Sequence, residues 1–462
     1  MKPNILFILC DDLGWMDLGC YGSSFYETPH LDRLAKRGIR FTDAYASCPV
    51  CSPTRASVLT GKYPATVGIT QFIGGHDVGS LCDVPYFDRL PLSEKTLPTV
   101  LKEQADYQTW HVGKWHLGPK GSWPENRGFD VNIGGWTAGH PTGGYFSPWG
   151  FPNLEDEPEG TYLTDHLNQK AIGLIKGRDQ DRPFFLNYWP YAVHTPIQAP
   201  EDLTEKYRKK AKDLGLDQQE PLEEGEEMST ISRQGQHLLR RRIQSNPEYA
   251  AMMENLDSNL GQLFSVLDQE GLTDNTLIVF TSDNGGLSTR EGSPTCNAPL
   301  AEGKGWMYEG GTREPLIASC PGVIKEGSRS DALTTTPDFY PTFLELAGLE
   351  PLPDQHVDGV SILSALKGED FDRGPIYWHY PHYSNQGGCP GSSIRHGTWK
   401  LIEFFEDNHL ELYDLQADLS EEHNLAADLP EKREELFHLL KDWQESVKAQ
   451  IPQPNVHWKK NT

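Results

Sequence analysis

A cysteine and an arginine in the stretch Cys51-Ser52-Pro53-Thr54-Arg55 are spaced to act on one anionic group. Pro53 suits the first turn of a helix, because its φ angle is already helical and its missing N–H would be unpaired there. We therefore predict a helix that begins at about Ser52, with Cys51 at its N-terminus. Free backbone N–H groups and the helix dipole favour an anion at that end. Arg55, four residues later, lies on the same helical face and adds a guanidinium.

Two apolar segments each end in a pair of oxygen-bearing residues. Residues 4–10 and 276–282 are typical of buried parallel strands, and they lead into Asp11-Asp12 and Asp283-Asn284. Each pair alone could be a turn, since Asp and Asn favour turns. Ligands gather at the carboxyl ends of strands in open α/β sheets, and these side chains offer only oxygen atoms. The two strand ends together predict a site for a hard cation.

Lysine and histidine follow another predicted strand. Lys114 and His116 leave an apolar segment that begins near Tyr107. Their i,i+2 spacing places both side chains on one face if the segment is extended. A surface lysine beside a core histidine is the ordinary alternative, and the pair alone does not exclude it.

In chain order these elements resemble the type I sulfatases of the alkaline phosphatase superfamily, in particular the arylsulfatase A-like and N-acetylgalactosamine-sulfatase-like group. The matching motifs are Cys-x-Pro-x-Arg, Gly-Lys-Trp-His at residues 113–116, and the segments that carry His194 and Lys304. A chance match of each is common, but a match of all in order is not. The resemblance implies two sets of site residues: Cys51, Arg55, Lys114, His116, His194 and Lys304 for catalysis, and Asp11, Asp12, Cys51, Asp283 and Asn284 for the metal.

The resemblance also implies two cofactors, a calcium ion and a formylglycine formed from Cys51 after translation. The hydrated aldehyde would attack sulfur, and its second hydroxyl would let the intermediate expel sulfate. Lys114 and Lys304 would bind the sulfate, and His194 would protonate the leaving alcohol. His116 and Arg55 would orient the hydrate, and His116 would take the proton in the elimination step. A formylglycine-generating or anaerobic sulfatase-maturing enzyme is the implied partner during biogenesis.

Two segments rich in aromatic and imidazole groups are candidates for substrate contacts. Residues 119–160 combine glycine, proline and aromatic residues, and residues 379–383 read His-Tyr-Pro-His-Tyr. Aromatic faces and imidazole donors suit a sugar, although loop or interdomain packing explains them almost equally well. The candidate sugar-binding residues are Trp136, His140, His379, His382 and Arg395.

We expect hydrolysis of sulfate esters, with exo action on a sulfated sugar of galactose or N-acetylgalactosamine type from a glycan. One alternative is a phosphonate or phosphate ester hydrolase of the same superfamily, which aryl phosphonate and aryl sulfate substrates would separate. Another is a non-catalytic, calcium-dependent glycan-binding protein, which measurable turnover would exclude.

The resemblance implies an α/β fold with a mixed, mostly parallel sheet between helices. We place the catalytic α/β domain at residues 1–374. Short, turn-separated runs from about Pro375 favour a smaller α+β domain at 375–462, with an antiparallel sheet and a closing helix. Residues 201–245 are strongly charged, and we expect a solvated excursion of helices and loop there.

The composition limits the partners. The 462 residues carry a formal net charge of −25, which argues against nucleic acid or an anionic membrane as partner. The apolar run after Met1-Lys2-Pro3 is too short for a signal peptide, so the chain is either cytoplasmic or begins after a removed signal and is periplasmic or secreted. Eight cysteines, seven without Cys51, disfavour a fully paired disulfide framework. Nothing in the sequence indicates the oligomeric state.

Overall fold

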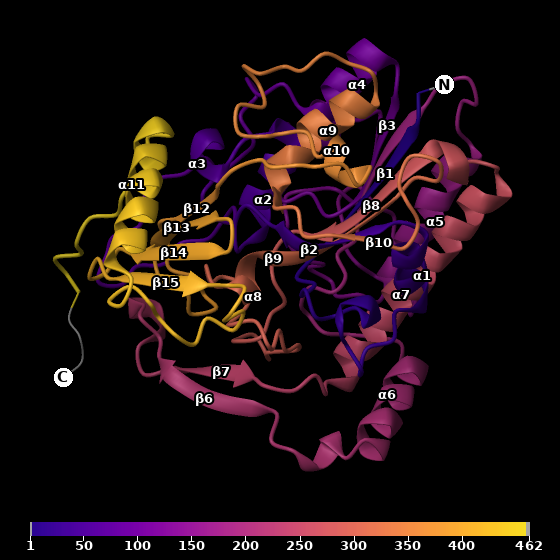
Figure 1. The fold of residues 1–462 in the computed structure, drawn as a ribbon. Helices are drawn as coiled ribbons and strands as arrows, with labels where there is room; N and C mark the ends of the chain where they lie inside the picture. The colour runs from indigo at the N-terminus through magenta and orange to yellow at the C-terminus, as the bar shows by residue number, and fades with distance from the viewer. Residues whose placement is uncertain (1, 459–462) are drawn as a thin grey trace.

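The computed structural model describes residues 2–458, and its centre is a mixed sheet (Figure 1). Its strands are β1 (Asn4–Cys10), β2 (Ile39–Tyr45), β3 (Gln108–Gly113), β4 (Val131–Ile133), β5 (Phe184–Trp189), β8 (Thr276–Ser282), β9 (Arg313–Ser319), β10 (Ser328–Ser330) and β11 (Thr334–Thr335). The order is β10-β2-β9-β8-β1-β5-β3-β4, and β11 pairs with β2. Among these strands only β9 runs antiparallel to its neighbours. This is the mostly parallel sheet that the sequence predicted.

Both faces of the sheet are covered by helices. All seven residues of β1 are buried, and its alternate side chains point to opposite faces, so a continuous apolar run is required. Leu6 and Ile8 belong to one core, and Ile5 and Phe7 belong to the other. Helices α1 (Pro29–Arg37), α5 (Leu163–Lys176), α6 (Glu201–Asp213) and α7 (Pro247–Gln269) contribute to the first core. The second core includes residues of α2 (Cys51–Thr60), α3 (Pro64–Val67), α4 (Leu97–Ala105), α9 (Phe339–Leu346) and α10 (Leu363–Leu366).

Helix α7 shows how the local sequence sets an element of the fold. The side chain of Asn246 accepts hydrogen bonds from two backbone N–H groups of the first turn, and Pro247 occupies the first helical position. Leucines recur on one face at positions 256, 260, 263 and 267, and all four are fully buried. The amphipathic helix predicted from Pro247 to about Glu270 is therefore confirmed.

A second, antiparallel sheet follows near the C-terminal end of the chain. It consists of β12 (Ile376–Tyr380), β13 (Gly391–His396), β14 (Trp399–Phe404) and β15 (Leu410–Asp414), in that order. Helix α11 (Pro430–Ser446) packs on this sheet through Leu436 and Leu440, which share a core with Leu401. Figure 1 shows this unit, in orange and yellow, at one side of the central sheet. The domain boundary at residue 375 stays a prediction.

The charged segment 201–245 differs from the expectation of helices and loop. After α6 it forms a β-hairpin of β6 (Leu222–Glu227) and β7 (His237–Arg241), which extends from the body of the molecule in Figure 1. Acidic residues of the first half face basic residues of the second: Glu226 lies 2.7 Å from Arg240, and Glu223 lies 2.6 Å from Arg242. Opposite charges on the two strands favour their pairing. Hydrophobic periodicity along the sequence does not reveal this complementarity, because it depends on contacts between two separate segments.

Two global features of the described residues complete the fold. None of their helices combines the length and apolar character that a membrane span requires. All eight cysteines are free thiols, five of them buried. The remaining α-helix, α8 (Glu309–Thr312), directly precedes β9 of the central sheet. Its Glu309 forms an ion pair with Lys400 of β14 in the second sheet.

Candidate active site

The ends of β1 and β8 bring two pairs of oxygen-bearing side chains together. The strands are parallel neighbours with Cys10 beside Ser282, so the residues that follow emerge at the same edge. The amide of Asn284 donates to Asp12 at 2.9 Å, and the backbone N–H of Asp12 donates to Asp283 at 3.3 Å. We call Asp11, Asp12, Asp283 and Asn284 the strand-end site. All four of its residues are fully buried.

Each carboxylate of the strand-end site has a cationic partner. Lys114 lies 2.7 Å from Asp11, and Lys304 lies 2.8 Å from Asp12. Arg55 lies 2.6 Å from Asp283. Burial alone would raise the pKa of Asp12, but Lys304 and His194 outweigh it and hold that pKa below its usual range. The formal charges of the three pairs cancel. Burial nevertheless raises the pKa of Asp11, because Lys114 opposes it only in part.

Cys51 is the first residue of α2 and is buried beside His116. Its Sγ lies 3.3 Å from Nδ1 of His116, while Nε2 of the same ring lies 3.0 Å from the carbonyl oxygen of Ile73. Burial raises the pKa of the Cys51 thiol, and Lys114 and Lys304 only partly oppose this. The helix N-terminus therefore does not make Cys51 a thiolate, contrary to a simple dipole argument.

The chain between Lys114 and His116 is not extended, as the i,i+2 argument assumed. Strand β3 ends at Gly113, and His116 has a left-handed φ of 56°. The two side chains reach the site separately: Lys114 turns to Asp11, whereas His116 turns to Cys51. Both residues therefore contact the predicted site, but the chain reaches it through a turn and not along a shared strand face.

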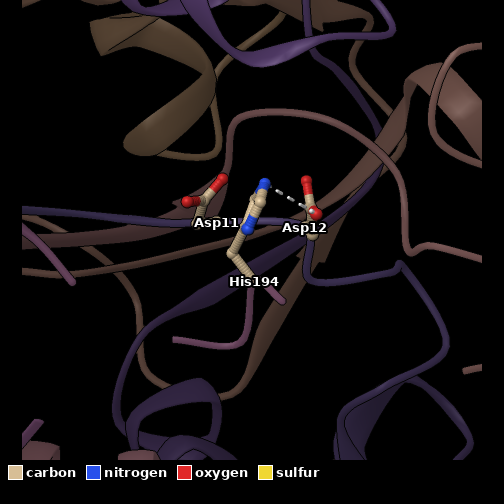
Figure 2. Close-up of side chains that lie close together, drawn as sticks. All are labelled: Asp11, Asp12 and His194. Carbon is tan, nitrogen blue, oxygen red and sulfur yellow. Dashed lines mark ion pairs between the residues drawn. The ribbon is translucent and has the colours of Figure 1, made fainter. Parts of the chain in front are cut away.

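His194 follows β5 and faces both Asp12 and Lys304. Figure 2 shows its ring against the two aspartates, with Nε2 at 3.6 Å from Asp12. Nδ1 lies 2.8 Å from the carbonyl oxygen of Thr195, so the proton of the neutral ring belongs on Nδ1. Nε2 is then free to accept from the ammonium of Lys304 at 3.2 Å. The hydroxyl of Tyr145 lies 2.9 Å from the carbonyl oxygen of His194 and holds this loop in place.

A cavity of about 300 Å³ opens next to Cys51. Of the predicted residues, it is lined by Cys51, His116, His140, His194 and Lys304. Arg55 and Lys114 are fully buried behind it and contact the carboxylates of the strand-end site instead. Its volume is at the lower end of the range for small-molecule sites. The cavity therefore joins a potential nucleophile to imidazoles and a buried ammonium.

The sulfatase family model matches residues 3–349, and a model described as "N-sulphoglucosamine sulphohydrolase, C-terminal" matches residues 302–450. The chain belongs to the sulfatase family. Sulfatases hydrolyse sulfate esters, so this protein is an enzyme of that reaction class. The fold, family and reaction class predicted from the sequence are confirmed.

Individual relatives are named for sulfated sugars. The chain is 33% identical to the N-acetylgalactosamine-6-sulfatase of Homo sapiens over 82% of this chain and 68% of that protein. It is 29% identical to the N-acetylglucosamine-6-O-sulfatase of Bacteroides thetaiotaomicron over 98% of this chain and 88% of that protein. A crystal structure of Ps i-CgsB superposes with a TM-score of 0.75 at 30% identity, covering 96% of this chain and 93% of that one.

Most of the candidate sugar-binding residues of this sulfatase lie away from the cavity. The imidazole of His379 contacts Ser392 at 2.7 Å and the carbonyl oxygen of Gln450 at 3.1 Å. His382 contacts Thr70 at 2.8 Å and pairs with Asp83. Arg395 pairs with Asp43 in a separate cavity. The ring of Trp136 packs against Phe151. Protein groups thus satisfy His379, His382 and Arg395, whereas the indole N–H of Trp136 has no hydrogen-bond partner among the described residues. Of the five, only His140 lines the cavity.

The cavity wall also contains residues that the sequence did not single out. They come from four separate loops: Phe72, Ile73 and Gly74; Thr137, Ala138 and Gly139; Glu291; and Asn385 and Gln386. No motif marks them, although residues 137–139 belong to segment 119–160, which the sequence indicated as a candidate for substrate contacts. The predicted segment 379–383 ended two residues before Asn385.

The strand-end site of this sulfatase fits a hard cation. Oδ1 of Asn284 is buried and has no hydrogen-bond partner among the described residues, which is rare for a buried amide oxygen. Ligand atoms of Asp11, Asp12 and His194 lie within 4.8 Å of one another. Asp283 is outside that group, and its carboxylate lies 2.6 Å from Arg55. Oxygen donors predominate, as calcium prefers.

Proposed function

We propose that this sulfatase removes sulfate from a sugar of galactose or N-acetylgalactosamine type, acting on a terminal residue of a glycan. The observation that carries the proposal is the cavity beside Cys51, in which Lys304, His116 and His194 converge. Its volume of about 300 Å³ suits one sugar ring better than a polymer that passes through. The names of the relatives favour a 6-sulfated sugar as the first substrate to test.

We infer that residue 51 acts as formylglycine, because the chain carries the family's Cys-x-Pro-x-Arg motif at the start of α2. Once formed, the aldehyde supplies a hydrate hydroxyl as the nucleophile. His116 is positioned to receive a proton from residue 51, since the Ile73 carbonyl can only accept and keeps the ring's own proton on Nε2. Burial of both residues keeps bulk water from competing for this contact.

Calcium is the proposed occupant of the strand-end site, where it would add two positive charges and polarise a sulfate oxygen. The formal charges of that site cancel in the protein alone, because its three carboxylates face three cations, Lys114, Lys304 and Arg55. Lys304 is the ammonium that lines the cavity, and Lys114 lies behind Asp11. We assign Lys304 to direct contact with the sulfate. The positive charge of Lys114 compensates the negative charge of Asp11 and, from a longer distance, that of the sulfate.

Departure of the alcohol requires a proton, and His194 with Lys304 forms the donor pair. Nε2 of His194 accepts from the Lys304 ammonium at 3.2 Å, so a proton can pass along this contact to an oxygen in the cavity. Arg55 binds no substrate in this arrangement. It joins α2 to the ends of β8 and β3 through Asp283 and the carbonyl oxygen of Lys114, at 2.6 and 3.2 Å.

The test is a panel of defined sulfated monosaccharides, with the protein produced together with a formylglycine-forming enzyme. We expect sulfate release from N-acetylgalactosamine 6-sulfate or galactose 6-sulfate, and none from Cys51→Ala. Hydrolysis of an aryl phosphonate at a higher kcat/KM than every sulfate ester would contradict the proposal. So would the release of sulfate only from internal positions of a polymer.

A further inference from the structure

A carboxylate lies on the wall of the sulfate cavity, and no cation of the described residues is in direct contact with it. Glu291 lines the cavity together with Lys304 and His140, and it is exposed to solvent. Among the described residues no ion pair of contact distance involves Glu291, and Lys304 is the only lysine or arginine on the same wall. Lys304, His140 and the neighbouring Arg290 attract the carboxylate only from a longer distance. An unpaired negative charge opposes binding of any anion, so its presence beside a sulfate site calls for an explanation.

The backbone holds Glu291 in a fixed and unusual conformation. Three consecutive residues, Glu291 to Ser293, have left-handed φ angles of 55°, 89° and 42°. Such angles are costly outside glycine and persist where the surroundings impose them. Here the β6–β7 hairpin does so: Ser293 donates to the carbonyl oxygen of Leu239 at 2.6 Å, and the N–H of Arg241 donates to that of Ser288 at 2.8 Å.

Two amides orient the side chain without neutralising it. The side chains of Asn385 and Gln386 both donate to Oε1 of Glu291, the second at 3.1 Å. In the described part of the chain, no hydrogen bond reaches Oε2. Neutral donors fix the position of the carboxylate, but its full charge remains. One oxygen is therefore left to accept from a molecule in the cavity.

We propose that Glu291 determines substrate specificity: it accepts hydrogen bonds from hydroxyl groups of the sulfated sugar and excludes sugars that carry a second anionic group. This inference rests on the proposed function and adds a charge criterion to it. A second sulfate or a carboxylate on the same ring would meet Glu291 and would find no free cation on the wall. A hydroxyl in that place donates to the carboxylate, and this offsets the repulsion of the departing sulfate.

The experiment compares N-acetylgalactosamine 6-sulfate with N-acetylgalactosamine 4,6-disulfate, which differ by one anionic group. Matured wild-type enzyme should show a kcat/KM ratio of about tenfold or more in favour of the monosulfate at low ionic strength. The ratio should fall as salt is added, because screening weakens the repulsion. Glu291→Gln keeps the acceptor for Asn385 and Gln386 but removes the charge. It should reduce the ratio to about twofold to threefold, mainly through faster turnover of the disulfate.

The matched control is Glu369→Gln, which removes an exposed carboxylate that lines no part of the cavity and should leave the ratio unchanged. The proposal is overturned if Glu291→Gln keeps the wild-type ratio, or if the wild type prefers the disulfate. Release of sulfate from 4-nitrophenyl sulfate distinguishes failure of the charge criterion from failure of the proposed function. If that ester is hydrolysed but the ratio does not respond to Glu291, only the charge criterion fails. If no sulfate ester is hydrolysed, the proposed function fails as well.

Discussion

Nδ1 of His116 lies 3.3 Å from Sγ of Cys51, while Nε2 of the same ring lies 3.0 Å from the carbonyl oxygen of Ile73. A carbonyl oxygen only accepts, so the proton of the neutral ring belongs on Nε2 and Nδ1 faces residue 51 as an acceptor. The contact to Ile73 thus determines which nitrogen of His116 can accept a proton from residue 51 in the proposed mechanism. It also places the loop that contains Ile73 in the wall of the cavity.

His116→Ala should therefore lower kcat by about 10²-fold to 10⁴-fold on every sulfate ester, as expected for loss of a positioned base. KM should change much less, because the variant keeps Lys304, the ammonium that we propose to bind sulfate. Steady-state kinetics with a matured enzyme measures both constants. An increase in KM with an unchanged kcat would show instead that His116 only binds substrate.

Calcium should stabilise the folded protein through the strand-end site. At about one hundred times the Kd, a ligand that binds only the folded state adds about 2.7 kcal/mol, which appears as a higher Tm. Asn284→Ala removes the unpartnered buried oxygen and should abolish most of this calcium-dependent increase. Asn168→Ala in α5, which removes a buried asparagine outside the strand-end site, should keep it. A Tm that does not respond to calcium, or zinc found by elemental analysis of active enzyme, would contradict the assignment.

The second sheet is attached to the catalytic body by a buried ion pair. Lys400 of β14 lies 2.9 Å from Glu309 of α8 and 2.9 Å from Glu421, and all three side chains are fully buried. Lys400→Met leaves Glu421 without a cation and should cost about 3–5 kcal/mol of unfolding free energy. Lys432→Met, in an exposed pair with Glu435, should cost about 0–1 kcal/mol. Denaturant unfolding measures both variants, and equal losses would contradict the prediction.

The strand ends were predictable from the sequence because their signal is local. A run of apolar residues makes a buried strand, and the next residues must emerge at the carboxyl edge of the sheet. This reasoning located Asp12 and Asp283 near each other. The family motifs then added Cys51, His194 and Lys304, which share one cavity in the structure.

The cavity wall was not predictable in the same way, because it depends on contacts between loops that are distant in sequence. Glu291 is held by amides nearly one hundred residues later and by a hairpin fifty residues earlier. Conversely, His379 belongs to β12 and is buried among protein partners, so its chemical type misled the interpretation. Residue type indicates what a side chain can do, but only the tertiary packing decides whether substrate can reach it.

The burial of His379 predicts a dependence of stability on pH. Burial lowers its pKa to about 3, because the charged form loses its hydration. In the unfolded chain a histidine titrates near 6.5, so below that pH the unfolded state takes up a proton that the folded state refuses. Stability from this group is complete above pH 6.5 and should fall by about 2.5 kcal/mol on going to pH 4.5.

His379→Gln removes this titration and should flatten the slope of unfolding free energy between pH 6.5 and 4.5 relative to the wild type. Ser392 and the carbonyl oxygen of Gln450 remain as partners for the new amide, which limits the loss of stability at neutral pH. Denaturant unfolding at a series of pH values measures the difference between the two proteins. Parallel curves for the wild type and the variant would mean that folding does not lower the pKa of His379, which would contradict the prediction.

The chemical state of residue 51 tests the central claim most directly. Peptide mass spectrometry of several preparations gives the fraction of Cys51 converted to aldehyde, and the rate of sulfate release from one sugar substrate is measured on the same samples. We predict a rate proportional to the aldehyde fraction, which extrapolates to zero for protein that is entirely thiol. Burial raises the pKa of that thiol, so it offers no competing nucleophile at neutral pH. Full activity in protein whose Cys51 is unmodified would contradict the account.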